Sequence, residues 1–191
     1  MTVTDPRFWA KRLDEAARKG ESHRAVLDES VEYWNATNAK SFRILHQVTA
    51  FYSVRSVLDA GCGIGSLSEA FGPEISYVGV DFSPELIIHA KYLYPRREFY
   101  VNDLRDLAGF ADDEFGLVFC RGVEGTAKIG YGNEVWAVME KELLRVTKTV
   151  LVSMGLYHSH RYDLVNKDGC RLMGIASDPA GEEFDERERL R

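Results

Sequence analysis

The chain has 191 residues, of which 45% are hydrophobic and 28% are charged. These proportions are typical of a globular domain, and they exclude a collagen-like or wholly disordered chain. Asp and Glu number 30 against 24 Lys and Arg, so the formal net charge is −6. This acidic balance disfavours nucleic acid as a partner, because phosphate contacts need a surplus of basic side chains, and it equally disfavours an anionic membrane surface.

The cysteines and the N-terminal residues predict a cytoplasmic location. Cys62, Cys120 and Cys170 lie far apart, with neither a CxxC pair nor a Cys/His spacing suited to zinc. We therefore expect no metal site and no disulfide framework, as in a reducing compartment. Residues 1–12 lack the apolar core of a secretory signal, and no segment is as long as a membrane span, so no membrane contact is expected.

Residues 1–52 are predicted to form an N-terminal helical cap. The pair Asp5-Pro6 combines a capping side chain with a proline at the first helical position, and the helix it begins is expected to end near Gly20. A second helix is expected over residues 22–34 and a third over residues 41–52, where apolar side chains recur on one stripe. These helices precede the first strong strand, so we expect them to flank or cover the sheet.

From residue 53 onward, short apolar runs alternate with helical patterns. Five strands are predicted, at residues 56–60, 76–81, 98–101, 115–120 and 150–154. Helices are expected after Ser83-Pro84-Glu85 and from Asn133, whereas the connection 104–114 is too short for a full crossover helix. Such alternation predicts an α/β fold with a doubly wound, Rossmann-like, mostly parallel sheet over residues 53–181.

The C-terminal part of this domain gives a weaker pattern. After Met154 the strand signal fades, apart from a possible hairpin around residues 166–169, so we expect a sheet that is shortened at its C-terminus. Residues 182–191 form a charged tail, which we expect to be ordered only if another surface docks it.

A glycine-rich loop follows the first predicted strand. Gly61, Gly63 and Gly65 allow a sharp turn and a close approach of the backbone to a ligand. Ser66 stands where the dinucleotide-binding pattern would have its third glycine. Asp59, two residues before the first glycine, would repel a diphosphate but would attract a ligand that carries an ammonium and a sulfonium.

Two further acids follow the next two predicted strands. Asp81 can accept the hydroxyls of a ribose, which suits either a nicotinamide or an adenosyl cofactor. Asp103 could accept the amino group of adenine, and Phe82 and Leu104 could enclose the ring. Because the carboxyl ends of parallel strands meet at one edge of a sheet, all these side chains are expected around one ligand.

These residues resemble the class I S-adenosylmethionine-dependent methyltransferases. The resemblance runs through residues 57–65, 77–83, 102–104 and 115–123, and it covers roughly residues 40–155. It implies a seven-stranded sheet with S-adenosyl-L-methionine at these strand ends and S-adenosyl-L-homocysteine as the product. It also implies that the glycine loop contacts the methionine part of the cofactor, Asp81 the ribose and Asp103 the adenine amino group. We predict twelve cofactor-binding residues, namely Asp59, Gly61, Cys62, Gly63, Gly65, Asp81, Phe82, Asn102, Asp103, Leu104, Cys120 and Arg121.

The chain departs from the family pattern at the fourth predicted strand. Gly116 stands where an acid is common, and residues 120–124 lack the Asp/Asn-Pro-Pro-Tyr run of enzymes that methylate amide or base amino groups. Such acceptors are therefore less expected than others. Glu124 and His158 are the predicted catalytic residues, as candidate bases. Three further candidates for the pocket are His160, Tyr131 and Tyr157.

The predicted function is O- or N-methylation of an unidentified small-molecule acceptor. Two alternatives stay open at this point. One is a non-catalytic protein that binds S-adenosylmethionine, and the other is a nicotinamide-dependent oxidoreductase on a similar sheet. Ser66 and Asp59 argue against the oxidoreductase.

Overall fold

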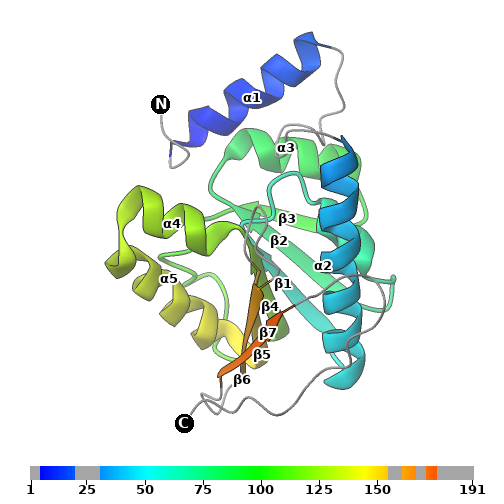
Figure 1. Cartoon of the computed structure of the whole chain (residues 1–191), viewed down its shortest axis with the longest axis vertical. Helices are drawn as coiled ribbons and strands as arrows, with labels where there is room; N and C mark the ends of the chain where they lie inside the picture. Colours follow the sequence, from blue (N-terminus) through cyan, green and yellow to red (C-terminus); the bar gives the residue numbers. More distant parts are fainter. Residues whose placement is uncertain (1–4, 20–30, 155–160, 167–170, 176–191) are drawn as a thin grey trace.

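A computed structural model describes residues 5–19, 31–154, 161–166 and 171–175. Its sheet has seven strands in the order β3-β2-β1-β4-β5-β6-β7 (Figure 1). The first five strands are parallel to one another and have the following bounds: β1 Ser56–Ala60, β2 Ser76–Asp81, β3 Glu98–Val101, β4 Phe115–Arg121 and β5 Thr147–Met154. Strands β2 and β3 lie on one side of β1, and β4 and β5 lie on the other, so the strand order reverses between β1 and β4. A ligand-binding edge is therefore expected at the carboxyl ends of these two strands. The doubly wound fold predicted from the strand pattern is thus confirmed.

The sheet is not shortened in the way we expected. Strands β6 (Arg161–Asn166) and β7 (Arg171–Ile175) extend it beyond β5 as an antiparallel hairpin. Antiparallel strands need only a short connection, and parallel ones need a crossover of a dozen or more residues. The hairpin therefore adds two strands within a length of chain that would hold only one crossover.

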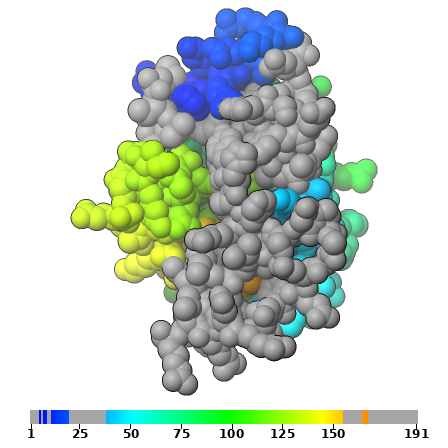
Figure 2. All heavy atoms as spheres, in the orientation of Figure 1, coloured from blue at the N-terminus to red at the C-terminus, as the bar shows by residue number. Residues whose placement is uncertain are grey.

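Two helical layers cover the two faces of the sheet. One layer consists of α2 (Val31–Phe51), the short 3₁₀ helix η2 (Ser66–Ala70) and α3 (Pro84–Leu93), and the other consists of α4 (Val123–Tyr131) and α5 (Asn133–Val146). In the space-filling view α4 and α5 form a continuous yellow-green flank (Figure 2). None of the helices in the described part of the chain is both long and apolar enough to cross a membrane.

The N-terminal helices differ in part from the prediction. Helix α1 (Pro6–Arg18) begins as expected, with the Asp5 side chain accepting a hydrogen bond from the Arg7 N–H. The break predicted between residues 34 and 41 is wrong, because α2 continues through it without any glycine or proline to stop it. Leu45 and Val48 of α2 are fully buried in the same core as the sheet, so α2 is a layer of the fold. A domain boundary at residue 52 stays a prediction, and residues 22–30 lie outside the described part.

The connection between β3 and β4 contains no helix, as predicted. The side chain of Arg145 on α5 holds this connection in place, because it donates hydrogen bonds to the backbone carbonyls of Leu107 (2.9 Å) and Phe110 (3.0 Å). Glu142 on the same helix accepts from the Leu107 N–H at 3.1 Å. The loop that connects β3 to β4 is therefore held against α5 by hydrogen bonds.

Candidate cofactor site

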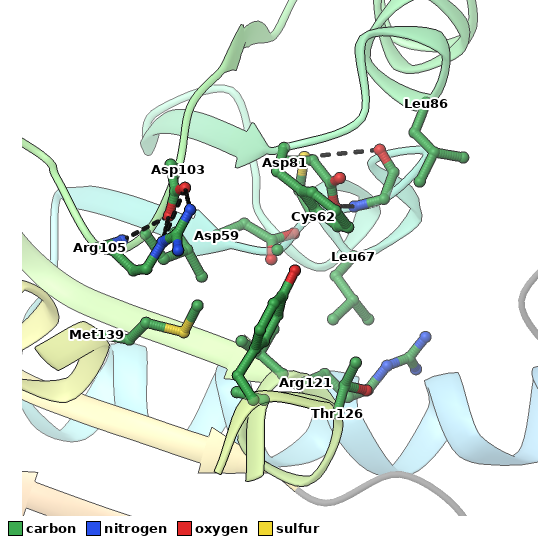
Figure 3. A pocket seen from close by; sticks show the side chains of 18 of the residues that line it. Asp59, Cys62, Leu67, Asp81, Leu86, Asp103, Arg105, Arg121, Thr126 and Met139 are labelled. Carbon is green, nitrogen blue, oxygen red and sulfur yellow. Dashed lines mark hydrogen bonds and ion pairs between the residues drawn. The ribbon is translucent and has the colours of Figure 1, made fainter. Parts of the chain in front are cut away.

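A cavity of about 170 Å³ lies at the carboxyl ends of β1, β2 and β4 (Figure 3). Its walls come from the glycine loop, the start of α3, the loop after β3, and helices α4 and α5. Nineteen residues line it: Asp59, Gly61, Cys62, Gly63, Ser66, Leu67, Asp81, Phe82, Leu86, Asp103, Leu104, Arg105, Arg121, Gly122, Val123, Thr126, Ala127, Tyr131 and Met139. Nine of the twelve predicted cofactor-binding residues are among them, and the other three, Gly65, Asn102 and Cys120, are not.

The glycine loop has the backbone that its sequence predicts. Gly61, Gly63 and Gly65 have φ values of +79°, +55° and +76°, a region that L side chains seldom adopt. At Gly61 an added Cβ would also lie 2.3 Å from Cγ2 of Val123, the first residue of α4. At Gly65 it would lie 2.6 Å from the Phe99 ring in the core. Gly65 is therefore needed for packing beneath the loop and does not line the cavity.

Asp81 connects the end of β2 to the glycine loop. Its side chain accepts the Gly63 N–H at Oδ2 (3.0 Å) and the Ser83 N–H at Oδ1 (2.9 Å). Ser83 in turn is the N-cap of α3, with its hydroxyl accepting from the Leu86 N–H at 3.5 Å. Burial raises the pKa of Asp81 to about 6, although these backbone N–H donors favour the ionised form and hold the rise down. One carboxylate thus orders both the loop and the helix start, and the carboxylate still lines the cavity.

Asp59 lies on β1 beneath the same loop, and its carboxylate points into the cavity (Figure 3). It is only 2% exposed, and it accepts a hydrogen bond of 2.6 Å from the hydroxyl of Tyr77 on β2. Burial raises the pKa of Asp59 to about 7, and the Asp81 charge adds to this rise. The Tyr77 hydroxyl and the positive charge of Arg121 act in the opposite direction. A cation bound nearby would favour the ionised carboxylate further.

The loop after β3 brings a third carboxylate to the cavity. Asp103 is paired with Arg105, whose Nε lies 2.9 Å from both carboxylate oxygens, and this pairing lowers the pKa of Asp103. The Arg105 guanidinium also lies 6.0 Å from the centre of the Tyr131 ring on α4. Leu104 and Phe82 line the cavity as predicted. Asn102, by contrast, lies outside the lining, and its backbone N–H continues the β2–β3 pairing by bonding to the Asp81 carbonyl.

The end of β4 contributes one of its two predicted residues to the cavity. Arg121 lines it, and Nη1 of its guanidinium donates to the side-chain oxygen of Asn38 on α2 at 2.5 Å. Cys120 is fully buried in the core on the other face of the sheet, where burial raises the pKa of its thiol to about 12. The alternation of side chains along a strand explains this, because neighbours on β4 must face opposite layers. Cys120 does not line the cavity.

The structure does not place Glu124 in the cavity. Glu124 lies in the first turn of α4, where Oε2 accepts from the Ser153 hydroxyl at 2.8 Å and Oε1 pairs with Lys128. Its carboxylate is thus held by Ser153 of β5 and by Lys128 of its own helix, and its role as a base stays a prediction. His158, with His160 and Tyr157, lies outside the described residues.

Sequence reasoning missed most of the wall that α4 provides. Val123, Thr126, Ala127 and Tyr131 of this helix all line the cavity, of which only Tyr131 was anticipated. The spacing of residues 123, 127 and 131 is that of one helical face, so this pattern could have predicted the helix.

Comparison with known proteins agrees with this geometry. A family model described as "Methyltransferase domain" matches residues 57–149, which hold β1 to β4, the glycine loop and the cavity-lining helices. No curated protein matches the chain.

Several solved structures are similar in fold. A protein of Methanococcus maripaludis, titled a putative S-adenosyl-L-methionine-dependent methyltransferase, has a TM-score of 0.51 at 19% identity, over 64% of this chain and 58% of that one. The magnesium protoporphyrin IX methyltransferase of Synechocystis, solved with its cofactor bound, has a TM-score of 0.49 at 22% identity, over 65% and 62%. The YcgJ protein of Bacillus subtilis has a TM-score of 0.44 at 24% identity, over 56% of this chain and 50% of that one.

The chain thus spans between about half and two thirds of these neighbours. The family match, the parallel sheet and the cavity at its carboxyl edge agree with one another. Through residues 57–149 the chain is thus similar to the methyltransferase-domain family, and its sheet has the fold of the Methanococcus maripaludis protein.

Proposed function

We propose that the protein is an S-adenosylmethionine-dependent methyltransferase that methylates an oxygen or a nitrogen of a small molecule. One arrangement carries this proposal. Asp59, Asp81 and Asp103, from the ends of three neighbouring strands, line a single cavity that begins at the glycine loop. A cytoplasmic location stays a prediction from composition alone.

The residues around the cavity fit this cofactor chemically. Besides its carboxylate, S-adenosylmethionine carries an ammonium, a sulfonium, two ribose hydroxyls and an adenine amino group, and these five groups are cations or hydrogen-bond donors. The cavity offers them three carboxylates: Asp59 for the positively charged methionine part, Asp81 for the ribose hydroxyls and Asp103 for the adenine amino group. Phe82 and Leu104 supply apolar surface for the adenine ring.

The bound cofactor would supply the methyl group together with its leaving group. The protein then has to align the acceptor with that methyl group and keep water away. Apolar side chains of three elements suit this task, since Leu67, Val123, Ala127 and Met139 line the cavity. A base is needed only where the acceptor must lose a proton, and for that role Glu124 and His158 stay predictions.

The two alternatives predict different ligands. A nicotinamide cofactor would bring a diphosphate to the glycine loop, where the buried Asp59 would repel it when ionised. A non-catalytic protein would bind the adenosyl cofactor but transfer nothing.

Calorimetric titration with S-adenosylhomocysteine and with NADH tests the cofactor. We expect one S-adenosylhomocysteine to bind per chain and NADH not to bind. Asp103→Asn should weaken S-adenosylhomocysteine binding by about tenfold through loss of a charged acceptor. Asp106→Asn is the matched control, because Asp106 lies in the same loop but does not line the cavity. Binding of NADH alone would refute the proposal.

A second experiment tests the reaction. Transfer of radiolabelled methyl from S-adenosylmethionine is measured across a panel of small molecules with hydroxyl, carboxyl and amino groups. We expect at least one acceptor to be labelled by the wild type and by Asp106→Asn. Tight cofactor binding without transfer to any acceptor would support the non-catalytic alternative.

A further inference from the structure

Tyr77 makes a contact with the candidate site that the proposed function leaves unexplained. It lies on β2, is 3% exposed, and does not line the cavity. Its hydroxyl nevertheless donates the 2.6 Å hydrogen bond to Oδ2 of Asp59. The Tyr77 hydroxyl therefore contacts the Asp59 carboxylate from the protein core and not from the cavity.

The register of the sheet explains how a tyrosine at this position can reach Asp59. Tyr77 is paired with Val57 and Gly79 is paired with Asp59, so the hydroxyl reaches two residues along β1. Gly79 has no room for a side chain, since an added Cβ would lie 2.6 Å from Phe99 and 3.0 Å from the Cys62 sulfur.

The Tyr77 ring is held from several sides. The Arg97 guanidinium lies 5.6 Å from the ring centre, and it donates hydrogen bonds to the carbonyls of Ile75 (3.1 Å), Gly72 (3.3 Å), Phe71 and Ser68. Phe71 and Phe99 contact the ring with centroid distances of 5.8 Å each. A buried, tightly packed ring of this kind places its hydroxyl at a defined point.

We propose that Tyr77 is a positioning residue for the cofactor. Its hydroxyl orients the Asp59 carboxylate toward the ammonium of the cofactor's amino-acid part and stabilises the ionised form of that carboxylate. This inference rests on the proposed function, because it requires a ligand whose ammonium, present in both S-adenosylmethionine and S-adenosylhomocysteine, lies near Asp59. It adds a residue that does not line the cavity but acts on the ligand through one that does.

The charges that face Asp59 define what removing the hydroxyl would do. Burial and the Asp81 charge raise the pKa of Asp59, whereas Tyr77 and Arg121 lower it, with a result of about 7. The Cys62 thiol is neutral, since burial raises its pKa well above the usual value. Loss of the Tyr77 hydroxyl leaves Arg121 as the remaining group that favours the ionised carboxylate, so the pKa of Asp59 should rise.

The substitution Tyr77→Phe tests this, with S-adenosylhomocysteine affinity measured by calorimetry between about pH 5.5 and pH 8.5. A hydrogen bond to an ionised group shifts the pKa by about one unit or more, so the variant should bind roughly fivefold to tenfold more weakly at pH 7. Near pH 8.5 the carboxylate is ionised in both proteins, and the difference should shrink to about twofold or less. A purely structural loss would instead be the same at every pH.

Two controls accompany the variant. Tyr100→Phe removes a tyrosine hydroxyl that bonds to Glu98 on the neighbouring strand β3, far more exposed than Tyr77, and should leave the pH profile unchanged. In an Asp59→Asn background, Tyr77→Phe should change the affinity by less than about twofold, because no carboxylate remains to be stabilised.

Each outcome bears on a definite claim. A Tyr77→Phe protein with the wild-type pH profile, or with a loss that does not depend on pH, overturns the role of Tyr77 alone. A wild-type affinity that is constant over this pH range also overturns it, without any Tyr77 variant being needed. Absence of S-adenosylhomocysteine binding by the wild type at every pH overturns both this inference and the proposed function.

Discussion

The close approach of α4 to the glycine loop predicts a large effect of Gly61→Ala. The new Cβ would lie 2.3 Å from Cγ2 of Val123, far inside van der Waals contact, at a residue with φ of +79°. The left-handed backbone should cost about 1–2 kcal/mol for a residue with a side chain, and forcing Val123 aside should cost about 1–3 kcal/mol more. We therefore expect the free energy of unfolding to fall by about 2–5 kcal/mol, measured by urea denaturation.

A second substitution separates the two costs. After Val123→Ala, the Cβ of residue 123 is the next atom that the new methyl group meets, at 3.7 Å, which is ordinary contact. The double variant should thus be more stable than the sum of the single effects by about 1–3 kcal/mol. Gly125→Ala in the same helix is the control, since its Cβ would meet nothing within 4 Å. That variant should be slightly stabilised, by about 0.5–1 kcal/mol. Additive effects of Gly61→Ala and Val123→Ala would refute the steric reasoning.

Three further predictions concern the buried charges and the β3–β4 connection. Asp81→Asn has one acceptor oxygen fewer, so a backbone N–H such as that of Gly63 loses its partner. Its S-adenosylhomocysteine affinity should fall by about 1–3 kcal/mol in calorimetry, and an unchanged affinity would remove Asp81 from the site. Because the folded-state pKa of Asp59 is raised from 3.8 to about 7, the wild type without ligand loses stability as pH rises through that window. Asp59→Asn should therefore unfold at higher urea than the wild type at about pH 8 but at a similar concentration near pH 4, and equal curves at both pH values would contradict this. Arg145→Met removes the donor to the Phe110 carbonyl and should cost about 1–3 kcal/mol in unfolding, whereas no loss would show that the loop holds its own shape.

Several features of this protein could be predicted because their causes are local in the chain. Asp5-Pro6 begins α1 and Ser83-Pro84 begins α3, since a capping side chain and a proline act within one turn. The glycine spacing requires the left-handed backbone seen at Gly61, Gly63 and Gly65. The acids that follow the strands meet at one cavity because parallel strands end at the same edge.

Other features depend on contacts between distant segments, and only the tertiary structure decided them. Helix α2 runs unbroken because its apolar face packs on the sheet, and β6 and β7 form strands because β5 offers them an edge. The side chain of Cys120 faces the opposite layer, and that of Glu124 is held by Ser153, a residue 29 positions away in the chain. The sequence alone predicted nine of the residues that line the cavity. The packing of the sheet decided which of the predicted residues reach the cavity, and it placed Tyr77 behind Asp59, because burial and register arise only when separate strands come together.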